Sequence, residues 1–369
     1  MAERTDVFVI GGGPAGLGAA IAARQRGFSV MVADGARPPI DKACGEGLMP
    51  DTVAALGALG VRLERGEGHA FRGIRFVSGD AEVDASFPNG PGLGLRRLAL
   101  HTKLIAHAEE RGVKLLWKTP VAGVREDGVA LADGRAIAAR WIVGADGIRS
   151  RVRRWIGAEK ETRRGVRYAC RRHYKVAPWS DCTEVYWGEN SQAYVTAVSG
   201  DEVCVAMIAE HPRISFEELE RVFPRLAKRV EFAEGSGSDR GAITTMRRLD
   251  RVYRGNVALI GDASGSVDAI TGDGLNLSFH QATALADALV SGDLRAYQRA
   301  HRRLARRPTW MGRLMLTLGT RPILRERIMR ALVADPRIFA RLMAMHVGET
   351  TPAHVAATGA LLGWRIAVA

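Results

Sequence analysis

The first 34 residues contain the pattern that most constrains the fold. The segment TDVFVI is apolar and β-branched, as expected of a buried parallel strand, and Gly11, Gly13 and Gly16 follow it. The first glycine permits a tight turn, the second lets the backbone approach a pyrophosphate, and the third lets a helix pack closely on the strand. The helix then points its N-terminal amides at the phosphates. A second strand ends at Asp34, whose carboxylate can accept hydrogen bonds from a ribose diol. The pattern predicts a dinucleotide-binding β–α–β unit.

Length and composition describe a globular chain without a membrane span. The 369 residues allow one large domain or two connected domains. No apolar run reaches the roughly 18 residues that a spanning helix needs, and no basic-then-apolar leader opens the chain. Cys44, Cys170, Cys182 and Cys204 show neither CxxC spacing nor paired histidines. We therefore expect no metal site, no disulfide framework and a cytoplasmic location.

Positive charge is concentrated in one segment. The chain carries a net charge of +13, and residues 295–341 hold thirteen arginines against only two acids, Glu326 and Asp335. One interpretation is peripheral contact of residues 295–341 with an anionic membrane. Docking of an acidic carrier protein or of CoA phosphates is another, and helices with solvated arginine faces are the third. Nucleic acid is not expected as a partner, because the basic segment follows a cofactor domain and no nucleic-acid-binding motif occurs. The oligomeric state stays open.

Two later segments have the same strand–turn–helix pattern. In ARWIVGADGIRSRVRRWIG a buried strand precedes a turn at Asp146 and Gly147. In GNVALIGDASGSVDAITGDGLN a strand ends at Asp262, and a helix begins at about Gly272. Asp262 can bind a hydroxyl group, and the amides that open the helix, those of Gly274, Leu275 and Asn276, can face a carbonyl oxygen or a developing anion.

These three motifs, in this order, resemble the flavin signatures of the para-hydroxybenzoate-hydroxylase-like flavoproteins. That superfamily includes aromatic hydroxylases, other monooxygenases, flavin halogenases and geranylgeranyl reductases. The resemblance covers roughly residues 1–290 and implies noncovalently bound FAD, with NAD(P)H as a transient reductant. It implies an α/β (α+β) fold: a Rossmann-like FAD-binding domain, an inserted antiparallel-sheet substrate domain and C-terminal helices.

The resemblance also implies boundaries and a set of flavin contacts. The FAD-binding domain is expected at 1–70, 96–165 and 240–292, the substrate sheet at 71–95 and 166–239, and the arginine-rich helices at 293–369. Arg97, with Arg96 as its competitor, matches an arginine near the flavin phosphates, and Val121 matches a backbone contact to adenine. The predicted FAD-binding residues are Gly11, Gly13, Pro14, Ala15, Gly16, Asp34, Cys44, Gly45, Arg97, Val121, Asp146, Gly147, Gly261, Asp262, Gly272, Gly274, Leu275 and Asn276.

The loop KACGEGLMP, residues 42–50, falls where the resembled family folds a loop over the flavin. It is similar both to a Lys-x-Cys-Gly-Gly-Gly loop of geranylgeranyl reductases and to a Gly-Glu-x-Leu-x-Pro loop of some hydroxylases. We therefore expect Cys44 and Glu46 near the flavin ring, with catalytic roles. The alternative is that Cys44 is a small buried apolar residue and that Glu46 caps the next helix.

Other candidates for catalysis and substrate binding come from two later segments. Asp268 lies in a loop similar to that of reductases and halogenases, and is predicted to be catalytic. Its alternative is a turn carboxylate that bonds its own backbone. Four strands are expected between about Val166 and Ile208, because the segment alternates and is rich in β-branched residues. Aromatic residues of this sheet are predicted to line the substrate cavity, with plain core packing as the alternative: Tyr186, Trp187 and Tyr194.

The resemblance favours a monooxygenase that acts through a flavin C4a-hydroperoxide. The expected substrate is a small lipophilic aromatic, polyketide or isoprenoid compound of secondary metabolism, free or tethered to a carrier. A reductase or dehydrogenase acting on a carbon–carbon bond is the alternative enzyme, with Cys44 or Glu46 handling the proton. A non-enzymatic, flavin-binding redox sensor is the third alternative.

Overall fold

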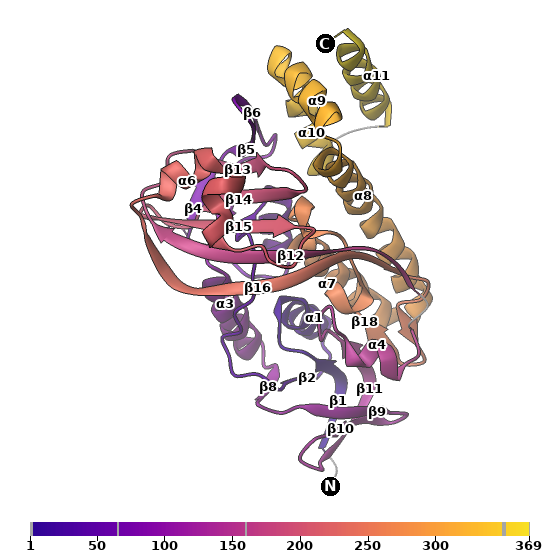
Figure 1. The fold of residues 1–369 in the computed structure, drawn as a ribbon. Helices are drawn as coiled ribbons and strands as arrows, with labels where there is room; N and C mark the ends of the chain where they lie inside the picture. Colours follow the sequence, from indigo (N-terminus) through magenta and orange to yellow (C-terminus); the bar gives the residue numbers. More distant parts are fainter. Residues whose placement is uncertain (1–2, 65, 159–160, 349–351, 369) are drawn as a thin grey trace.

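The computed structural model describes residues 3–64, 66–158, 161–348 and 352–368. They form a mixed α/β fold with a parallel sheet, an antiparallel sheet and a set of C-terminal helices (Figure 1). The long strands β12 and β16 extend from the antiparallel sheet toward the parallel one, and α8 runs from the parallel sheet to the remaining C-terminal helices. The predicted fold class is confirmed.

The first sheet is built around β1, which is parallel to β2 on one side and to β11 on the other. Its path is β17-β18-β11-β1-β2-β8, with β9 and β10 joined beside β11. Because β1, β2, β8, β11 and β18 are parallel, their carboxyl ends meet at one edge, where chain order reverses on either side of β1. Such a switch point is where ligands bind to open α/β sheets. The strands are β1 (Glu3–Ile10), β2 (Val30–Asp34), β8 (Lys114–Trp117), β9 (Val121–Arg125), β10 (Gly128–Leu131), β11 (Ala136–Gly144), β17 (Tyr253–Arg254) and β18 (Val257–Leu259).

The second sheet covers the ligand-binding edge of the first. Its order is β19-β16-β12-β15-β14-β13-β5-β6, antiparallel except where β13 runs parallel to β5. Its strands are β5 (Gly73–Ser78), β6 (Ala81–Ser86), β12 (Glu161–Lys175), β13 (Cys182–Trp187), β14 (Ser191–Ala197), β15 (Glu202–Ala209), β16 (Glu234–Leu249) and β19 (Gly265–Ser266). The predicted domain boundaries at 165/166 and 239/240 fall inside β12 and β16. They need correction because these two strands pair along their length and belong to one sheet.

A small third sheet joins the two larger ones. It consists of β3 (Gly47–Leu48), β4 (His69–Phe71) and β7 (Gly92–Gly94). A Cβ at Gly94 would lie 1.8 Å from the carbonyl oxygen of Ala197 in β14, so only glycine allows this approach. The contact brings the loop before β3 close to the second sheet.

The helices pack on both sheets. In the first sheet's core, α1 and α7 pack against each other, and both bury small apolar residues. The second sheet has a separate core on each face, one shared with α8, α9 and α10 and one with α5 and α6. The helices are α1 (Pro14–Gln25), α2 (Pro50–Ala58), α3 (Arg97–Glu110), α4 (Arg151–Trp155), α5 (Leu219–Val222), α6 (Pro224–Val230), α7 (Gly274–Ser291), α8 (Leu294–Thr320), α9 (Pro322–Ala334), α10 (Pro336–His346) and α11 (Pro352–Val368), with short 3-10 turns at Phe216–Glu218, Gly261–Ser264 and Ala269–Thr271.

Candidate functional site

A cavity of about 680 Å³ lies between the two sheets and α8. One end is formed by the carboxyl ends of the parallel strands, and the other by the second sheet and methionines of α8 and α10. Most of the predicted FAD-binding residues line it: Gly11, Gly13, Pro14, Ala15, Asp34, Cys44, Gly45, Arg97, Val121, Asp146, Gly147, Asp262, Gly272, Gly274 and Leu275.

The remaining three of these residues lie behind the cavity wall. A Cβ at Gly16 would lie 1.9 Å from the carbonyl oxygen of Gly11, so its role is helix–strand packing. Gly261 has a φ of +59°, and a Cβ there would lie 2.7 Å from the Cβ of Ala15. Asn276 donates its side-chain N–H to Asp51 at 2.7 Å. Gly16 and Gly261 shape the wall, and the predicted direct contact is corrected at these two glycines. The prediction for Asn276 concerns its backbone N–H at the start of α7 and stays a prediction.

The polar end of the cavity has the groups that a dinucleotide requires. A Cβ at Gly13 or Gly274 would meet no atom within 4 Å, so the backbone at both turns faces open space. Asp34 is fixed by two backbone N–H donors, those of Gly12 and Ala36, each at 2.7 Å. Within the described residues, Asp146 Oδ1 and Arg97 Nε are buried and have no hydrogen-bond partner. An open glycine cradle with an unused acceptor and an unused cationic donor matches the hydroxyls and phosphates of FAD.

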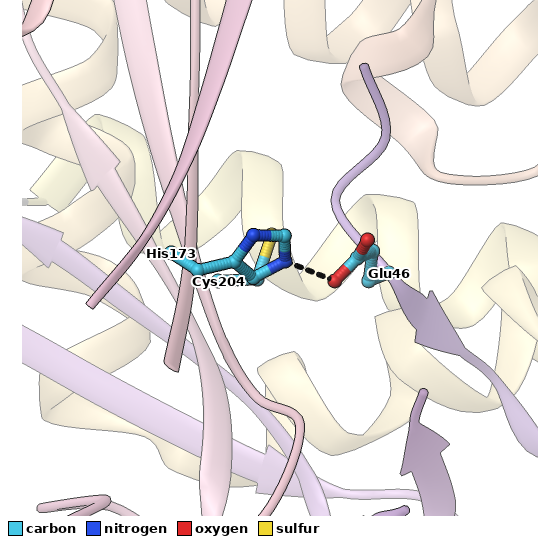
Figure 2. Close-up of side chains that lie close together, drawn as sticks. All are labelled: Glu46, His173 and Cys204. Atoms are coloured by element: carbon cyan, nitrogen blue, oxygen red, sulfur yellow. Dashed lines mark hydrogen bonds and ion pairs between the residues drawn. The ribbon is translucent and has the colours of Figure 1, made fainter. Parts of the chain in front are cut away.

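Beside this cradle, Glu46 is held in an unusual backbone conformation. Its φ is +59°, in the left-handed region that non-glycine residues rarely adopt, and the residue is only 2% exposed. Its carbonyl oxygen accepts from the Leu95 N–H at 2.9 Å, and Oε1 accepts from the Arg97 N–H at 2.9 Å. Oε2 lies 2.6 Å from His173 Nε2, as Figure 2 shows. These bonds hold the loop against α3 and β12 and offset the strain.

The hydrogen bonds around His173 determine which ring nitrogen carries the proton. Arg171 Nη1 lies 2.9 Å from His173 Nδ1, and a guanidinium can only donate, so Nδ1 is the acceptor. The proton therefore sits on Nε2, which donates to Glu46. Arg171 Nη2 also donates to Asp41 at 2.6 Å, and the other Asp41 oxygen accepts from Arg240 at 2.9 Å. Opposite charges thus alternate from the buried Glu46 to the half-exposed Arg240, and we call these five residues the Glu46 clamp.

A sulfur atom completes this cluster. Ligand atoms of Glu46, His173 and Cys204 all lie within 4.8 Å of one another (Figure 2). Burial raises the pKa of the Cys204 thiol well above its ordinary value, and the nearby Glu46 charge raises it further. The thiol keeps its proton, and the Nε2 lone pair of His173 is already used by a proton. We interpret the cluster as a hydrogen-bonded network, because both oxygens of Glu46 and both ring nitrogens of His173 already have protein partners.

Both carboxylate oxygens of Glu46 are occupied by protein donors, so its predicted role as a proton-transferring group gives way to a positioning role. Cys44 differs, because it lines the cavity and its Sγ accepts only a long contact from the Glu46 N–H, at 3.4 Å. From the sequence we did not identify His173, Arg171 or Asp41 as residues of the site. The run ACRRHYK indicates a strand, but it does not show which of its arginines is buried.

Comparison with known proteins assigns the family. The model of the FAD binding domain matches residues 4–296. The chain belongs to this FAD-binding family, which includes flavoprotein monooxygenases and geranylgeranyl-reductase-like enzymes. It is an FAD-dependent oxidoreductase.

Individual relatives are of more than one kind. A menaquinone reductase of Mycobacterium tuberculosis is 29% identical over 328 residues, which cover 79% of this chain and 78% of the relative. A ubiquinone hydroxylase of Rhodospirillum rubrum is 27% identical over 323 residues, covering 78% and 72%. The crystal structure of a flavoprotein/dehydrogenase from Cytophaga hutchinsonii superimposes with a TM-score of 0.80 at 20% identity, covering 94% of this chain and 93% of that one, and so shows the same fold.

Asp268 is not among the residues that line the cavity. Its Oδ1 accepts from Arg167 Nη1 at 2.8 Å and from the Ile270 N–H at 3.0 Å, and the residue is 2% exposed. The predicted catalytic role is therefore corrected to the alternative, a turn carboxylate, with the addition of a buried ion pair. Arg167 in turn contacts Gln192 and the carbonyl oxygen of Ile208, which fixes the turn to the second sheet.

The three predicted substrate aromatics separate onto different surfaces. Tyr194 lines the cavity, and its hydroxyl donates to the Ile270 carbonyl at 2.8 Å. Tyr186 faces the opposite core, where its hydroxyl donates to Glu184 at 2.7 Å. Trp187 packs edge-to-face on Phe76, with ring centroids 5.6 Å apart, beyond the end of the cavity. The prediction is corrected for Tyr186, because side chains alternate between the two faces of a strand and Tyr186 faces the other core. Trp187 lies on the other face and lines the small apolar chamber next to the cavity, so its role stays a prediction.

We predict that substitution of two neighbouring glycines will separate FAD binding from folding. Gly13→Ala adds a methyl group to open space in the cradle, so the apoprotein should unfold at the parent temperature while FAD binds at least tenfold more weakly. Gly16→Ala forces a methyl group against the Gly11 carbonyl at 1.9 Å, so the apoprotein itself should lose several degrees of melting temperature. Calorimetry of apoprotein and fluorescence titration with FAD measure both effects. Unchanged FAD affinity in Gly13→Ala would contradict the assigned cradle.

A second prediction concerns the Glu46 clamp. In Glu46→Gln the amide NH2 must face one of two N–H donors, Arg97 N or His173 Nε2, and the buried Arg171 loses a compensating charge. We expect a loss of about 3 kcal/mol in the free energy of unfolding. The exposed Glu126→Gln is the matched control and should change it by less than about 0.5 kcal/mol. Denaturant unfolding tests this, and full stability with loss of turnover alone would instead restore Glu46 as a catalytic group.

Proposed function

We propose that the protein is a reductase that adds two hydrogens across a carbon–carbon double bond of a lipophilic substrate. The observation that carries this proposal is the two-part cavity. The cavity includes the FAD cradle, Cys44 and a set of apolar side chains, and a second, apolar chamber of only about 40 Å³ lies next to these apolar side chains. Cavity and chamber share four wall residues: Phe76, Met311, Met315 and Met343. Flexible methionine side chains can adapt to a long apolar ligand.

Each part of the site has a task in this reaction. When bound, reduced FAD supplies a hydride to one carbon of the double bond. The other carbon needs a proton, and the Cys44 thiol lines the cavity without a strong partner. Solvent then restores the thiol proton. The Glu46 clamp positions the Cys44 loop, and the apolar wall excludes water from the reacting carbons. NAD(P)H is the proposed source of the reducing equivalents.

The relatives support the lipophilic substrate class. One is a menaquinone reductase and another a ubiquinone hydroxylase, so both names contain a quinone. A quinone with an isoprenoid chain has one planar polar end and one long apolar end, which matches a cavity that is polar at the cradle and apolar among the methionines. We propose such a prenylated compound as the substrate.

A monooxygenase is the second candidate. The similarity to the ubiquinone hydroxylase extends over 78% of this chain, and a largely apolar cavity beside the flavin cradle also suits a reaction with oxygen. The two reactions differ in product: a reductase adds two hydrogens, whereas a monooxygenase adds one oxygen atom.

We therefore predict the outcome of an anaerobic single-turnover experiment. The FAD-loaded protein is reduced without oxygen, with one equivalent of dithionite per flavin, and mixed with menaquinone in detergent. Flavin absorbance should return to the oxidised form, and after air has reoxidised any quinol, mass spectrometry should find a menaquinone that keeps two added hydrogens. If product forms only when air is admitted and contains an added oxygen atom, the monooxygenase is correct. If neither product forms, the proposed substrate class is wrong.

Cys44→Ala tests the proton donor. We expect the substrate-dependent oxidation of the flavin to slow by about 100-fold, because general acid catalysis is lost, while reduction of the flavin by NAD(P)H is unchanged. Cys182→Ala is the matched control, since Cys182 is buried in β13 and does not line the cavity. Parent-like oxidation rates in Cys44→Ala would exclude this cysteine as the donor.

A further inference from the structure

Among the side chains of helix α11 that the structure describes, residues 357–365, the exposed ones are apolar, whereas the inner side also holds the buried Thr358 and the half-buried Arg365. Among residues 352–368 the sequence has a single charged residue, Arg365. Leu361 and Leu362 face inward and pack on the core shared by α8, α9 and α10. On the outer side Ala357, Ala360 and Trp364 are exposed, Trp364 by 57%. An exposed apolar helix surface of this kind marks a site of contact with a partner or a membrane.

The neighbouring helix α8 exposes arginines around a tryptophan. Arg303, Arg306, Trp310 and Arg313 are spaced three and four residues apart, so they form one stripe along the helix. All four are exposed, Trp310 by 48%. The buried side of the same helix carries Met311, Met315 and Leu318, which pack into the core.

Helices α9 and α10 repeat this arrangement. On α9, Ile323 is 72% exposed and shares a face with the exposed Arg327 and Arg330. On α10, Arg337 and Arg341 are one turn apart and exposed. Figure 1 shows α9, α10 and α11 grouped beyond the end of α8, away from the parallel sheet. We call the exposed sides of α8, α9, α10 and α11 the basic-apolar face.

The charge of this face decides which partner can cover it. Eleven of the thirteen arginines between residues 295 and 341 are exposed, with only Arg307 and Arg325 half-buried. A second copy of the chain would bring two such faces together, and like charges would repel. An anionic bilayer offers negative headgroups to the arginines and an apolar interior to Trp310, Ile323 and Trp364. Tryptophan prefers that interface.

We propose that the basic-apolar face docks on the surface of an anionic membrane. Within the described residues no helix is long and apolar enough to cross a bilayer. The helices of this face also form walls of the apolar chamber: Leu314 of α8, Leu332 of α9, Leu342 of α10 and Leu362 of α11. A lipophilic substrate therefore passes between these helices from the bilayer into the cavity. This last step rests on the proposed function, whereas docking itself does not.

The test is a sedimentation assay with sucrose-loaded vesicles and the full-length, FAD-loaded protein. Vesicles of phosphatidylcholine alone are compared with vesicles that also contain phosphatidylglycerol. We expect binding to the anionic vesicles, release by high salt, and little binding to the neutral ones. Equal binding to both compositions, or no binding to either, overturns the proposal. Because the assay needs no turnover, its result is independent of the proposed reaction.

Matched variants locate the surface. Three exposed arginines of α9 and α10 are changed to glutamine together, Arg327, Arg337 and Arg341, and this should weaken binding to anionic vesicles by about 100-fold. The control removes the same charge elsewhere, from the exposed Arg62, Arg140 and Arg248. An equal loss in the control would mean that net charge alone drives binding and would overturn the assigned face.

The apolar contribution needs its own variant. Trp310→Ser with Trp364→Ser should reduce vesicle binding and abolish quenching of tryptophan fluorescence by brominated lipids. Circular dichroism checks that the helices remain. If the double variant binds and is quenched like the parent, insertion of this face is excluded. Sedimentation velocity without vesicles tests the competing partner: a parent dimer that the double variant cannot form would show that a second copy covers the face.

Discussion

The buried contact between Glu46 and His173 is the interaction on which the arrangement of the site depends. It joins a loop that follows the parallel sheet to a strand of the antiparallel sheet, and so fixes how the cavity between the two sheets closes. A buried carboxylate is stable only when other groups satisfy its oxygens. Here the Arg97 N–H and the His173 ring do so, and Arg171 and Asp41 extend the compensation toward the surface. The left-handed backbone at Glu46 follows from these constraints.

The cavity between the two sheets has a polar end and an apolar end, because each end is built from a different part of the fold. The carboxyl ends of β1, β2, β11 and β18 provide backbone amides and carboxylates, as a parallel sheet does at its switch point. The other end is built from the second sheet and from α8 and α10, which supply methionines and Phe76. Cys44 also lines this cavity. The same C-terminal helices that complete the apolar end present arginines to solvent, which connects the proposed lipophilic substrate with the proposed membrane surface.

The sequence allowed prediction of the flavin cradle and the order of elements, because local chemistry determines both. A glycine-rich turn between a buried strand and a helix is typical of a dinucleotide-binding site. Gly11, Gly13 and Asp34 indeed line the cavity. Predictions failed where the outcome depended on distant partners. Strand alternation places Tyr186 and Trp187 on opposite faces, but the sequence does not show which part of a face meets the cavity. Asp268 was predicted to be catalytic from the similarity of its loop, and the sequence does not show its ion pair because the partner Arg167 lies 101 residues away in the chain. The buried histidine and arginine of β12 gave no local signal.

The most direct test of the Glu46 clamp is the protonation pattern of His173 itself. Nitrogen-15 NMR of the FAD-loaded protein with labelled histidine distinguishes a protonated ring nitrogen from a bare one, and His173→Asn identifies the signal. The account predicts at neutral pH a proton on Nε2, a bare Nδ1 that accepts from Arg171, and no change when zinc is added. A proton on Nδ1, or a zinc-dependent shift of the ring nitrogens, would contradict the clamp and indicate a metal-binding cluster of Glu46, His173 and Cys204 instead.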